Sequence, residues 1–265
     1  MRCIAAVSAI AVTAWISAGS QAAAWGGAGH EAIAHVAEQM LCPSAQSAVR
    51  QLLQLEGHKS LADVSTWADA VKEQLGKRGP RHALVLPLNG GPFQLDRDCA
   101  DRACVVPHME AYIKTLADPQ RDAKSRLKAL KFITHLVGDL HQPFHGATDD
   151  SRRATAKGKM IRLHTYWDSG LFRAAGLEQI DLATMIRRRA REQPRILDPL
   201  QAERWAEESR DIVRDHILPH LGPKDVAQPE DNPTMLAYYV SIAISRMSQA
   251  STRLAILLNR SFGCR

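Results

Sequence analysis

The chain has 265 residues, of which 45% are hydrophobic and 23% charged, and its formal net charge is +6. This length allows one large domain or two small ones, and the composition excludes a disordered polypeptide. Beyond the N-terminus no segment is long and apolar enough to span a bilayer. The mild basic excess suits an anionic substrate without specifying one.

Residues 1–24 form a separate segment. They contain one arginine, then an apolar run, then small residues that end in Ala22, Ala23 and Ala24. This is the pattern of a secretory signal peptide with an A-x-A cleavage site; an N-terminal membrane anchor is the alternative, which the short run disfavours. We predict a signal peptide over 1–24. The mature chain, 25–265, would begin at Trp25, carry no transmembrane anchor and be secreted or periplasmic.

The rest of the chain shows mainly helical periodicity. Apolar residues recur at three- and four-residue steps in segments 32–41, 45–55, 67–75, 109–117, 122–142, 164–175, 182–192, 203–221 and 234–259. An alternating β pattern is nearly absent, and only 82–88 is predicted as a short extended piece. Segments 88–107 and 146–160 are predicted as loops. This pattern predicts a single all-α domain, a multi-helix bundle.

Four cysteines remain after the predicted cleavage: Cys42, Cys99, Cys104 and Cys264. An even number in an exported chain predicts two disulfides. Cys99 and Cys104 are only five residues apart and would close a small loop, which leaves Cys42 to pair with Cys264. Four cysteines allow three pairings, and the sequence does not choose among them.

The segment 135–145, HLVGDLHQPFH, concentrates histidines beside an aspartate. His135 and Asp139 are four residues apart and share one face of the predicted helix. Pro143 ends that helix, and His145 lies just past it. These polar groups need a common partner if they face the core.

A second pair, His164 and Asp168, repeats the same spacing. One such pair is more often a surface or capping pair. Two of them around a histidine-rich turn favour a metal site with nitrogen and oxygen ligands, which suits zinc. The cysteines do not have ligand spacing, which argues against a structural Cys-type zinc site.

Further candidate ligands lie upstream. Asp69 follows Trp67 in STWAD, where the alternative is that it caps the helix or pairs with Lys72. His82 opens the extended piece. His30 follows a glycine-rich run that would let the new N-terminus fold back, and its alternative is an ordinary helix residue.

In chain order these motifs are WGxxGH, WAD, a lone His, a DRDC…C loop, HxxGDxHQPxH and LHxxWDxG. The chain resembles the zinc-dependent, single-strand-specific nucleases of the S1/P1 type, and more distantly the bacterial zinc phospholipases C. The resemblance covers nearly the whole mature chain. It implies an all-α fold that holds three zinc ions.

The resemblance also implies the ligands. The first zinc would be held by Asp69, His82, His135 and Asp139. The second would be held by His145, His164 and Asp168. The third would be held by His30, by Asp139 as a bridge, and by the α-amine and carbonyl of Trp25. His141 is not a ligand in this scheme and is expected to be structural.

The implied reaction is hydrolysis of single-stranded DNA and RNA to 5′-phosphorylated products, with 3′-nucleotidase activity as a further expectation. A hydroxide bridging two zinc ions would attack phosphorus. Asp69 would orient this nucleophile, and Lys72 would assist the phosphate. The expected partner is nucleic acid or a nucleotide, with no stable protein partner.

The chain departs from the family pattern in three places. Ala83 follows the lone histidine, where the family has an aromatic residue that stacks on the base. The segment 146–163 lacks the family's asparagine, and Lys72 replaces an arginine, losing the planar fork. Arg152 and Arg153 lie in a basic stretch that is either a solvated loop or a contact to the phosphate backbone.

Two alternative functions follow from these departures. One is a zinc phospholipase C that acts on phospholipid headgroups, although Asp168 follows the nuclease pattern where that relative typically has glutamate. The other is a catalytically weak zinc protein that only binds phosphorylated ligands. The altered base pocket motivates this second alternative.

Overall fold

A computed structural model describes residues 25–101, 103–148, 152–192, 201–222 and 226–264. Its longer helices are α1 (Gly26–Glu38), α2 (Pro43–Gln54), α3 (Trp67–Leu75), α5 (Val105–Ala117), α6 (Ala123–Leu140), α10 (Gln179–Glu192), α11 (Ala202–Ile212) and α12 (Pro233–Ser261). The short ones are α4 (Leu95–Asp98), α7 (Pro143–Gly146), α8 (Leu163–Thr165) and α9 (Leu171–Ala174). The mostly helical fold predicted from the sequence is confirmed. The predicted signal peptide lies outside the described residues.

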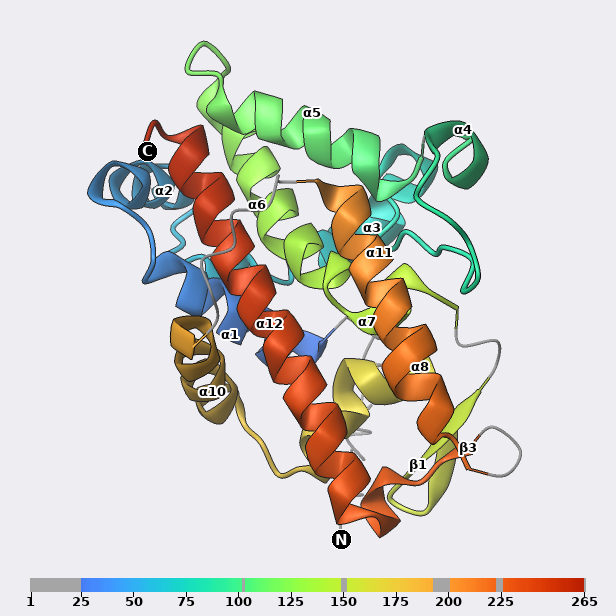
Figure 1. The fold of residues 1–265 in the computed structure, drawn as a ribbon. Helices are drawn as coiled ribbons and strands as arrows, with labels where there is room; N and C mark the ends of the chain where they lie inside the picture. Colours follow the sequence, from blue (N-terminus) through green and yellow to red (C-terminus); the bar gives the residue numbers. More distant parts are fainter. Residues whose placement is uncertain (1–24, 102, 149–151, 193–200, 223–225, 265) are drawn as a thin grey trace, which may run out of the picture.

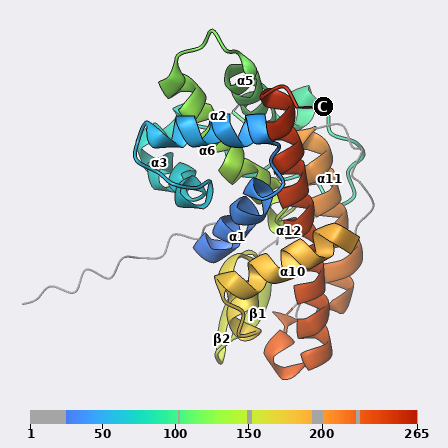
Figure 2. The ribbon, with the colours of Figure 1, turned by 90° about the vertical axis from the view of Figure 1, so that its left-hand side faces the viewer.

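The two longest helices, α12 and α6, form the frame of the molecule. The 29-residue α12 runs the length of the fold beside α11, and α6 packs against α12 (Figure 1). A view from the side shows α10 lying across α1 and α12 (Figure 2). Within the described ranges, none of the helices combines the length and apolarity needed to cross a bilayer.

Helix α6 is the central element. Asp122 caps its N-terminus by accepting a hydrogen bond from the Ser125 N–H at 2.9 Å. Nearly every residue from Leu127 to Leu140 is buried, so this helix is enclosed on all sides. It ends just before Pro143, since the residue before a proline avoids helical geometry. The chain then turns sharply, and this turn brings His145 back beside the end of α6.

The extended piece 82–88 is confirmed. The N–H groups of Leu84 and Leu86 donate to the carbonyls of His145 and Gly146, each at 2.9 Å. This pairing holds His82 against the turn that follows α6. Both disulfides also form with the expected partners, Cys42 with Cys264 and Cys99 with Cys104.

The predicted loop 146–160 is wrong in part, because it contains a β-hairpin. Strand β1 (Arg153–Ala156) pairs antiparallel with β2 (Lys159–Arg162) and parallel with β3 (Val226–Ala227). The hairpin turns at Lys157 and Gly158, both with positive φ, as a tight two-residue turn requires. The Lys-Gly pair between two short extended segments was the sequence feature that indicated a hairpin. The many basic residues around it made the segment resemble a polar loop.

Other element boundaries also differ from expectation. Helix α1 begins at Gly26, so the glycine-rich run is helical rather than a flexible connection. The predicted loop 88–107 contains α4 and the start of α5. The predicted helix 164–175 is interrupted by a π-helical segment, Tyr166–Gly170, and the helix predicted over 203–221 by another, Val213–Ile217. Such π segments insert one residue per turn and redirect side chains.

A buried polar network supports the end of α6 from behind. The guanidinium of Arg246 donates to the Trp205 carbonyl at 3.0 Å and the His141 carbonyl at 3.2 Å. Arg246 and Arg253 both pair with Glu208 at 2.6 Å. The network ties α11 and α12 to the residue that follows α6, and Glu208 compensates part of the charge of the two guanidinium groups.

Gly146 of α7 packs tightly against α11. A Cβ atom at this position would lie 2.6 Å from Ser209 Cβ and 2.8 Å from the Arg210 backbone nitrogen. We expect Gly146→Ala to lower the free energy of unfolding by about 1–3 kcal/mol, because two backbones must separate. Urea unfolding measures this effect. Gly91→Ala is the control, since no atom lies within 4 Å there, and an equal loss in both variants would contradict the packing argument.

Candidate metal centre

Histidine and aspartate side chains from distant segments meet beneath one cleft. Their ligand atoms form three groups that could each hold a metal ion. The groups are His30, His135 and Asp139; Asp69, His82 and His135; and His145, His164 and Asp168. Apart from Trp25, the sequence predicted eight side chains as zinc ligands, and the structure brings all eight together in these groups.

Asp139 lies at the centre of this assembly. Its carboxylate is fully buried, with Oδ1 3.3 Å from His30 Nε2 and Oδ2 3.0 Å from His135 Nε2. His82 Nδ1 lies 3.2 Å from the same Oδ2. Neither carboxylate oxygen accepts a hydrogen bond with acceptable geometry. The carboxylate thus faces three imidazoles from different parts of the chain and is placed to bridge two neighbouring groups.

Asp69 joins its group from α3. Its Oδ1 lies 3.0 Å from His82 Nδ1 and 3.5 Å from His135 Nε2, so it does not serve as a helix cap or as a partner of Lys72. Its Oδ2 is buried without a hydrogen-bond partner. One carboxylate oxygen therefore remains available for another ligand or proton donor.

Backbone carbonyls orient two of the imidazoles. His135 Nδ1 donates to the Ser65 carbonyl at 2.8 Å, and His145 Nδ1 donates to the His82 carbonyl at 2.8 Å. Each ring therefore presents Nε2 toward the carboxylates. In each ring one nitrogen is held by a hydrogen-bond acceptor, and the other can bind a cation. This arrangement is typical of metal-binding histidines.

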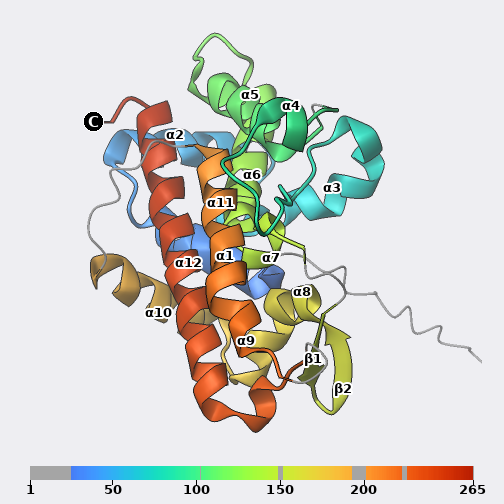
Figure 3. The ribbon, with the colours of Figure 1, turned by 45° about the vertical axis from the view of Figure 1, so that its right-hand side comes forward.

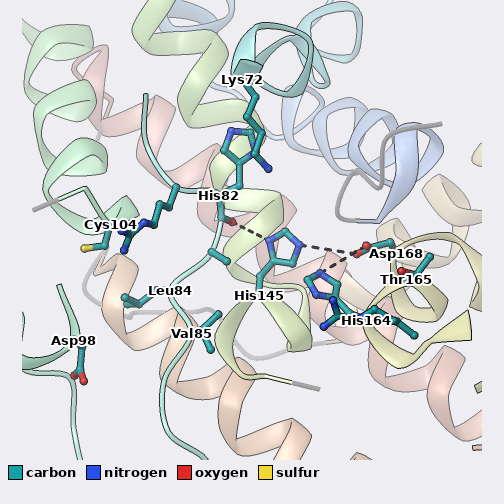
Figure 4. A pocket seen from close by; sticks show the side chains of 13 residues that line it. Lys72, His82, Leu84, Val85, Asp98, Cys104, His145, His164, Thr165 and Asp168 are labelled. Atoms are coloured by element: carbon teal, nitrogen blue, oxygen red, sulfur yellow. Dashed lines mark hydrogen bonds and ion pairs between the residues drawn. The ribbon is translucent and has the colours of Figure 1, made fainter. Parts of the chain in front are cut away.

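Asp168 sits on the π-helical segment, one turn after His164. Its oxygens lie 3.9 Å from His145 Nε2 and 3.6 Å from His164 Nε2 (Figure 4). Gln142 donates from Nε2 to Asp168 Oδ1 at 2.6 Å. Gln142 was not among the predicted site residues, although it lies inside HLVGDLHQPFH. Its position directly before the helix-ending proline was the signal that could have found it.

The charge balance of the site depends on protons when no metal is bound. Burial alone would raise the pKa of Asp139, but neighbouring imidazoles, His135 first, hold it well below its usual range. Burial opposes protonation of His135, yet Asp139 and Asp69 raise its pKa to about 10. Burial raises the pKa of Asp168 to about 8. A bound cation would replace these protons, so metal binding should release them.

The donor set fits zinc. Both ring nitrogens of His30, both oxygens of Asp139 and Oδ2 of Asp69 are buried without hydrogen-bond partners. Leaving so many buried polar atoms unsatisfied is costly unless a cation lies among them. The atoms are imidazole nitrogens and carboxylate oxygens, which zinc accepts in tetrahedral sites.

Trp25 and Gly138 complete the buried side of the centre. Trp25 is buried, and its Nε1 donates to the Gly138 carbonyl at 3.0 Å, directly before Asp139. A Cβ on Gly138 would lie 2.8 Å from two atoms of the His30 ring. The glycine is therefore needed for His30 to reach Asp139, which explains its place between His135 and Asp139 in the motif.

His141 lies apart from the three groups. Its Nδ1 donates to the Val137 carbonyl at 2.7 Å, and its Nε2 accepts from Arg253 at 2.8 Å. Burial and the neighbouring guanidinium groups hold its pKa well below the usual range. A neutral, fully bonded ring in this position supports the α11–α12 network.

An open cleft of about 540 Å³ leads to the group that contains His82 and to the group formed by His145, His164 and Asp168. Its lining includes His82, His145, His164 and Asp168 at the base (Figure 4). Three basic residues, Lys72, Arg81 and Arg162, also line it. Asp98 lines it too, and Arg81 pairs with Asp101, so the excess of positive charge is modest. The cleft thus combines a candidate metal centre with a modest excess of basic side chains, which suits an anionic group such as a phosphate.

Of the residues predicted to contact substrate, Lys72 and Ala83 are among those that line the cleft, and Arg152 and Arg153 are not. Lys72 and Ala83 line the cleft, next to the exposed Val85. Arg153 lies on β1 directly opposite Arg162, and the Arg152 carbonyl accepts a hydrogen bond from the Leu163 N–H at 2.9 Å. Arg162, which belongs to the basic stretch predicted to contact the phosphate backbone, lines the cleft itself, and so does Arg81, which was not predicted.

Known proteins resemble this chain over most of its length. A family model described as S1/P1 Nuclease matches residues 25–263. Nuclease S1 of Aspergillus oryzae is 30% identical over 156 residues, which cover 56% of this chain and 54% of that protein. Endonuclease 2 of Arabidopsis thaliana is 27% identical, covering 95% of this chain and 96% of the relative.

Nuclease P1 of Penicillium citrinum is 25% identical over 154 residues, covering 55% of this chain and 57% of the relative. The chain therefore aligns with about half the length of the two fungal proteins and with nearly all of the plant one.

The raised pKa of Asp168 predicts how stability depends on pH once metal is removed by chelation. Between about pH 4 and pH 8 the buried carboxyl stays protonated while the unfolded chain ionises, so stability should fall as pH rises. The loss is on the order of 1.4 kcal/mol per pH unit. We expect Asp168→Asn to flatten this decline in urea unfolding, whereas Asp118→Asn on the surface should not. An unchanged slope in Asp168→Asn would sink this explanation.

Proposed function

Because the chain belongs to the S1/P1 nuclease family, we propose that it is an exported zinc-dependent phosphodiesterase that hydrolyses single-stranded DNA and RNA. The observation that carries this proposal is the convergence of three His/Asp groups beneath a cleft lined by basic residues. Products with 5′-phosphates and a 3′-nucleotidase activity belong to the same proposal.

We assign the ligands of three zinc ions as the sequence motifs imply. His82, His135, Asp69 and Asp139 would hold the first ion. His145, His164 and Asp168 would hold the second. His30, Asp139 and the amine and carbonyl of Trp25 would hold the third. Bound zinc supplies positive charge to the phosphate and acidifies a water molecule toward neutral pH.

Two side chains of α3, Asp69 and Lys72, have separate roles in the proposed reaction. Asp69 Oδ2 makes no hydrogen bond and can hold the attacking water in line with phosphorus. Lys72 lies one turn further along α3 and lines the cleft, where its ammonium group can neutralise a phosphate oxygen. It does so as a point charge, without the bidentate contact of an arginine.

The walls of the cleft favour weak discrimination between bases. Ala83 and Val85 provide small apolar surfaces where an aromatic side chain would stack. Stacking on an aromatic side chain contributes about 1–3 kcal/mol per base, and no phenylalanine, tyrosine or tryptophan is among the described residues that line this cleft. Arg81 and Arg162 line the same cleft, and with Arg152 and Arg153 they would bind the sugar–phosphate backbone. We propose that recognition of the backbone dominates.

Export is supported by the disulfides. Cys42–Cys264 and Cys99–Cys104 are both formed, and disulfides persist mainly in oxidising compartments. The predicted signal peptide, 1–24, agrees with a secreted or periplasmic location.

A direct assay tests the reaction. We expect chelator-sensitive release of 5′-nucleotides from single-stranded DNA and RNA, with about three zinc ions per chain by elemental analysis. His145→Gln should lower the rate by at least about 10–100-fold, because it removes a ligand. His58→Gln makes the same change on a partly exposed histidine outside the three groups and should leave the rate unchanged.

Two outcomes of this assay contradict the nuclease proposal. Hydrolysis of phosphatidylcholine vesicles without cleavage of nucleic acid would assign the site to phospholipids. Zinc binding without turnover of any phosphodiester would leave a protein that only binds phosphorylated ligands.

The proposed role of the Trp25 amine gives a further prediction. Trp25 is anchored beside Asp139 through Gly138, and a Cβ on Gly26 would lie 3.3 Å from the Asp168 carbonyl. We expect protein that begins at Trp25 to bind about one more zinc than protein with two residues added before it, and to be about 10–100-fold more active. Full zinc content and activity in the extended form would exclude the amine as a ligand.

A further inference from the structure

A basic stripe on α10 lies far from the cleft. Helix α10 carries four arginines between residues 187 and 191, and one face presents Thr184, Arg187, Arg188 and Arg191 at helical spacing. These residues, with Glu192, line a surface hollow of about 410 Å³. Ile180 extends the same face by one turn and is 69% exposed. We call the face formed by Ile180, Thr184, Arg187, Arg188 and Arg191 the α10 stripe.

The charges on the stripe are only partly compensated. Glu192 lies 3.9 Å from Arg188 and 3.7 Å from Arg189, and it can neutralise about one of them. Within the described ranges, neither Arg187 nor Arg191 has an ion-pair partner, and Arg187 Nε is buried without a hydrogen-bond partner. A stripe that keeps about two positive charges beside a surface hollow is suited to an anion that reaches into the hollow.

The opposite face of α10 is already used. Leu182, Ala183 and Ile186 are buried, and the helix packs on α1 and α12. A helix that lies on a membrane surface needs a broad apolar face for the lipid, and Ile180 alone does not provide one. The basic residues are all arginines, whose planar fork matches phosphate oxygens.

We propose that the α10 stripe is a second binding site for single-stranded nucleic acid, separate from the catalytic cleft. A single strand offers both phosphates for the arginines and bases for the apolar end at Ile180. The choice of nucleic acid as occupant rests on the proposed nuclease function, while the phosphate chemistry rests on the stripe itself.

The location gives the site a distinct role. In Figures 1 and 3 α10 lies at the opposite edge of the fold from the β-hairpin, whose Arg162 lines the cleft. A short substrate can occupy only the cleft, but a long strand can contact both sites. Attachment at the stripe then raises the effective concentration of the strand at the cleft. The site should favour long strands over dinucleotides.

The test compares binding and hydrolysis. Arg188→Gln/Arg191→Gln removes two exposed charges, and Lys124→Gln/Lys128→Gln removes two exposed charges from α6 as a matched control. Binding is measured with a hydrolysis-resistant phosphorothioate strand of about 30 nucleotides, long enough for more than one site. We expect the α10 variant to bind about tenfold more weakly at low salt, with a salt slope smaller by about 1.4. The control variant should bind normally.

Hydrolysis separates this proposal from the proposed function. The α10 variant should cleave a dinucleotide at the normal rate and show a KM raised about tenfold for the long strand only. Unchanged binding and KM for the long strand would overturn the second site while leaving the nuclease function intact. Arg188→Lys/Arg191→Lys should restore part of the binding.

The binding arm remains informative if no nucleic acid is hydrolysed. Loss of phosphorothioate binding in the α10 variant would still establish the stripe as a nucleic-acid site. Binding to phosphatidylglycerol vesicles that depends on the same arginines, with no binding of the strand, would overturn the proposal in favour of an anionic lipid surface.

Discussion

The buried carboxylate of Asp139 is the constraint on which the rest of the centre depends. It lies in the protein interior without a hydrogen-bond donor of good geometry, and imidazoles from α1, α6 and the extended piece 82–88 surround it. A buried charge of this kind is stable only beside positive charge, which protons on His135 supply in the metal-free protein and cations supply when bound. The same electrostatic requirement therefore joins three segments of the chain and creates affinity for metal.

The scaffold controls where the ligand atoms point. Backbone carbonyls of Ser65 and His82 fix the rings of His135 and His145, and Gln142 fixes Asp168. Ser65 lies just before α3, whereas the positions of His82 and Gln142 are set by the turn after α6 and by its pairing with residues 84–86. Behind the turn, the arginine and glutamate network of α11 and α12 supports the same helix end. Rigid elements on both sides thus hold a polar cluster that would otherwise relax toward solvent.

Positive charge is distributed over two separate regions of the surface. One region surrounds the cleft, where Lys72, Arg81 and Arg162 combine with small apolar side chains rather than an aromatic platform. The other is the α10 stripe, on the far edge of the fold (Figure 3). Both favour the phosphate backbone over the bases, because guanidinium and ammonium groups attract phosphate irrespective of sequence. In the proposed function, the His/Asp groups would supply the metal chemistry, and these two basic regions would bind a long polyanion.

Local spacing in the sequence was sufficient to predict much of this protein. It predicted the helices, the extended piece at His82 and the candidate ligand pairs His135–Asp139 and His164–Asp168, because helical periodicity encodes which residues share a face. Which distant groups meet, such as Asp69 with His82, is decided by tertiary packing. So are the β-hairpin, which needs β3 beside it, and the π-helical segment that turns Asp168 toward His145. Their stabilising contacts come from residues far apart in the chain, so no local pattern records them.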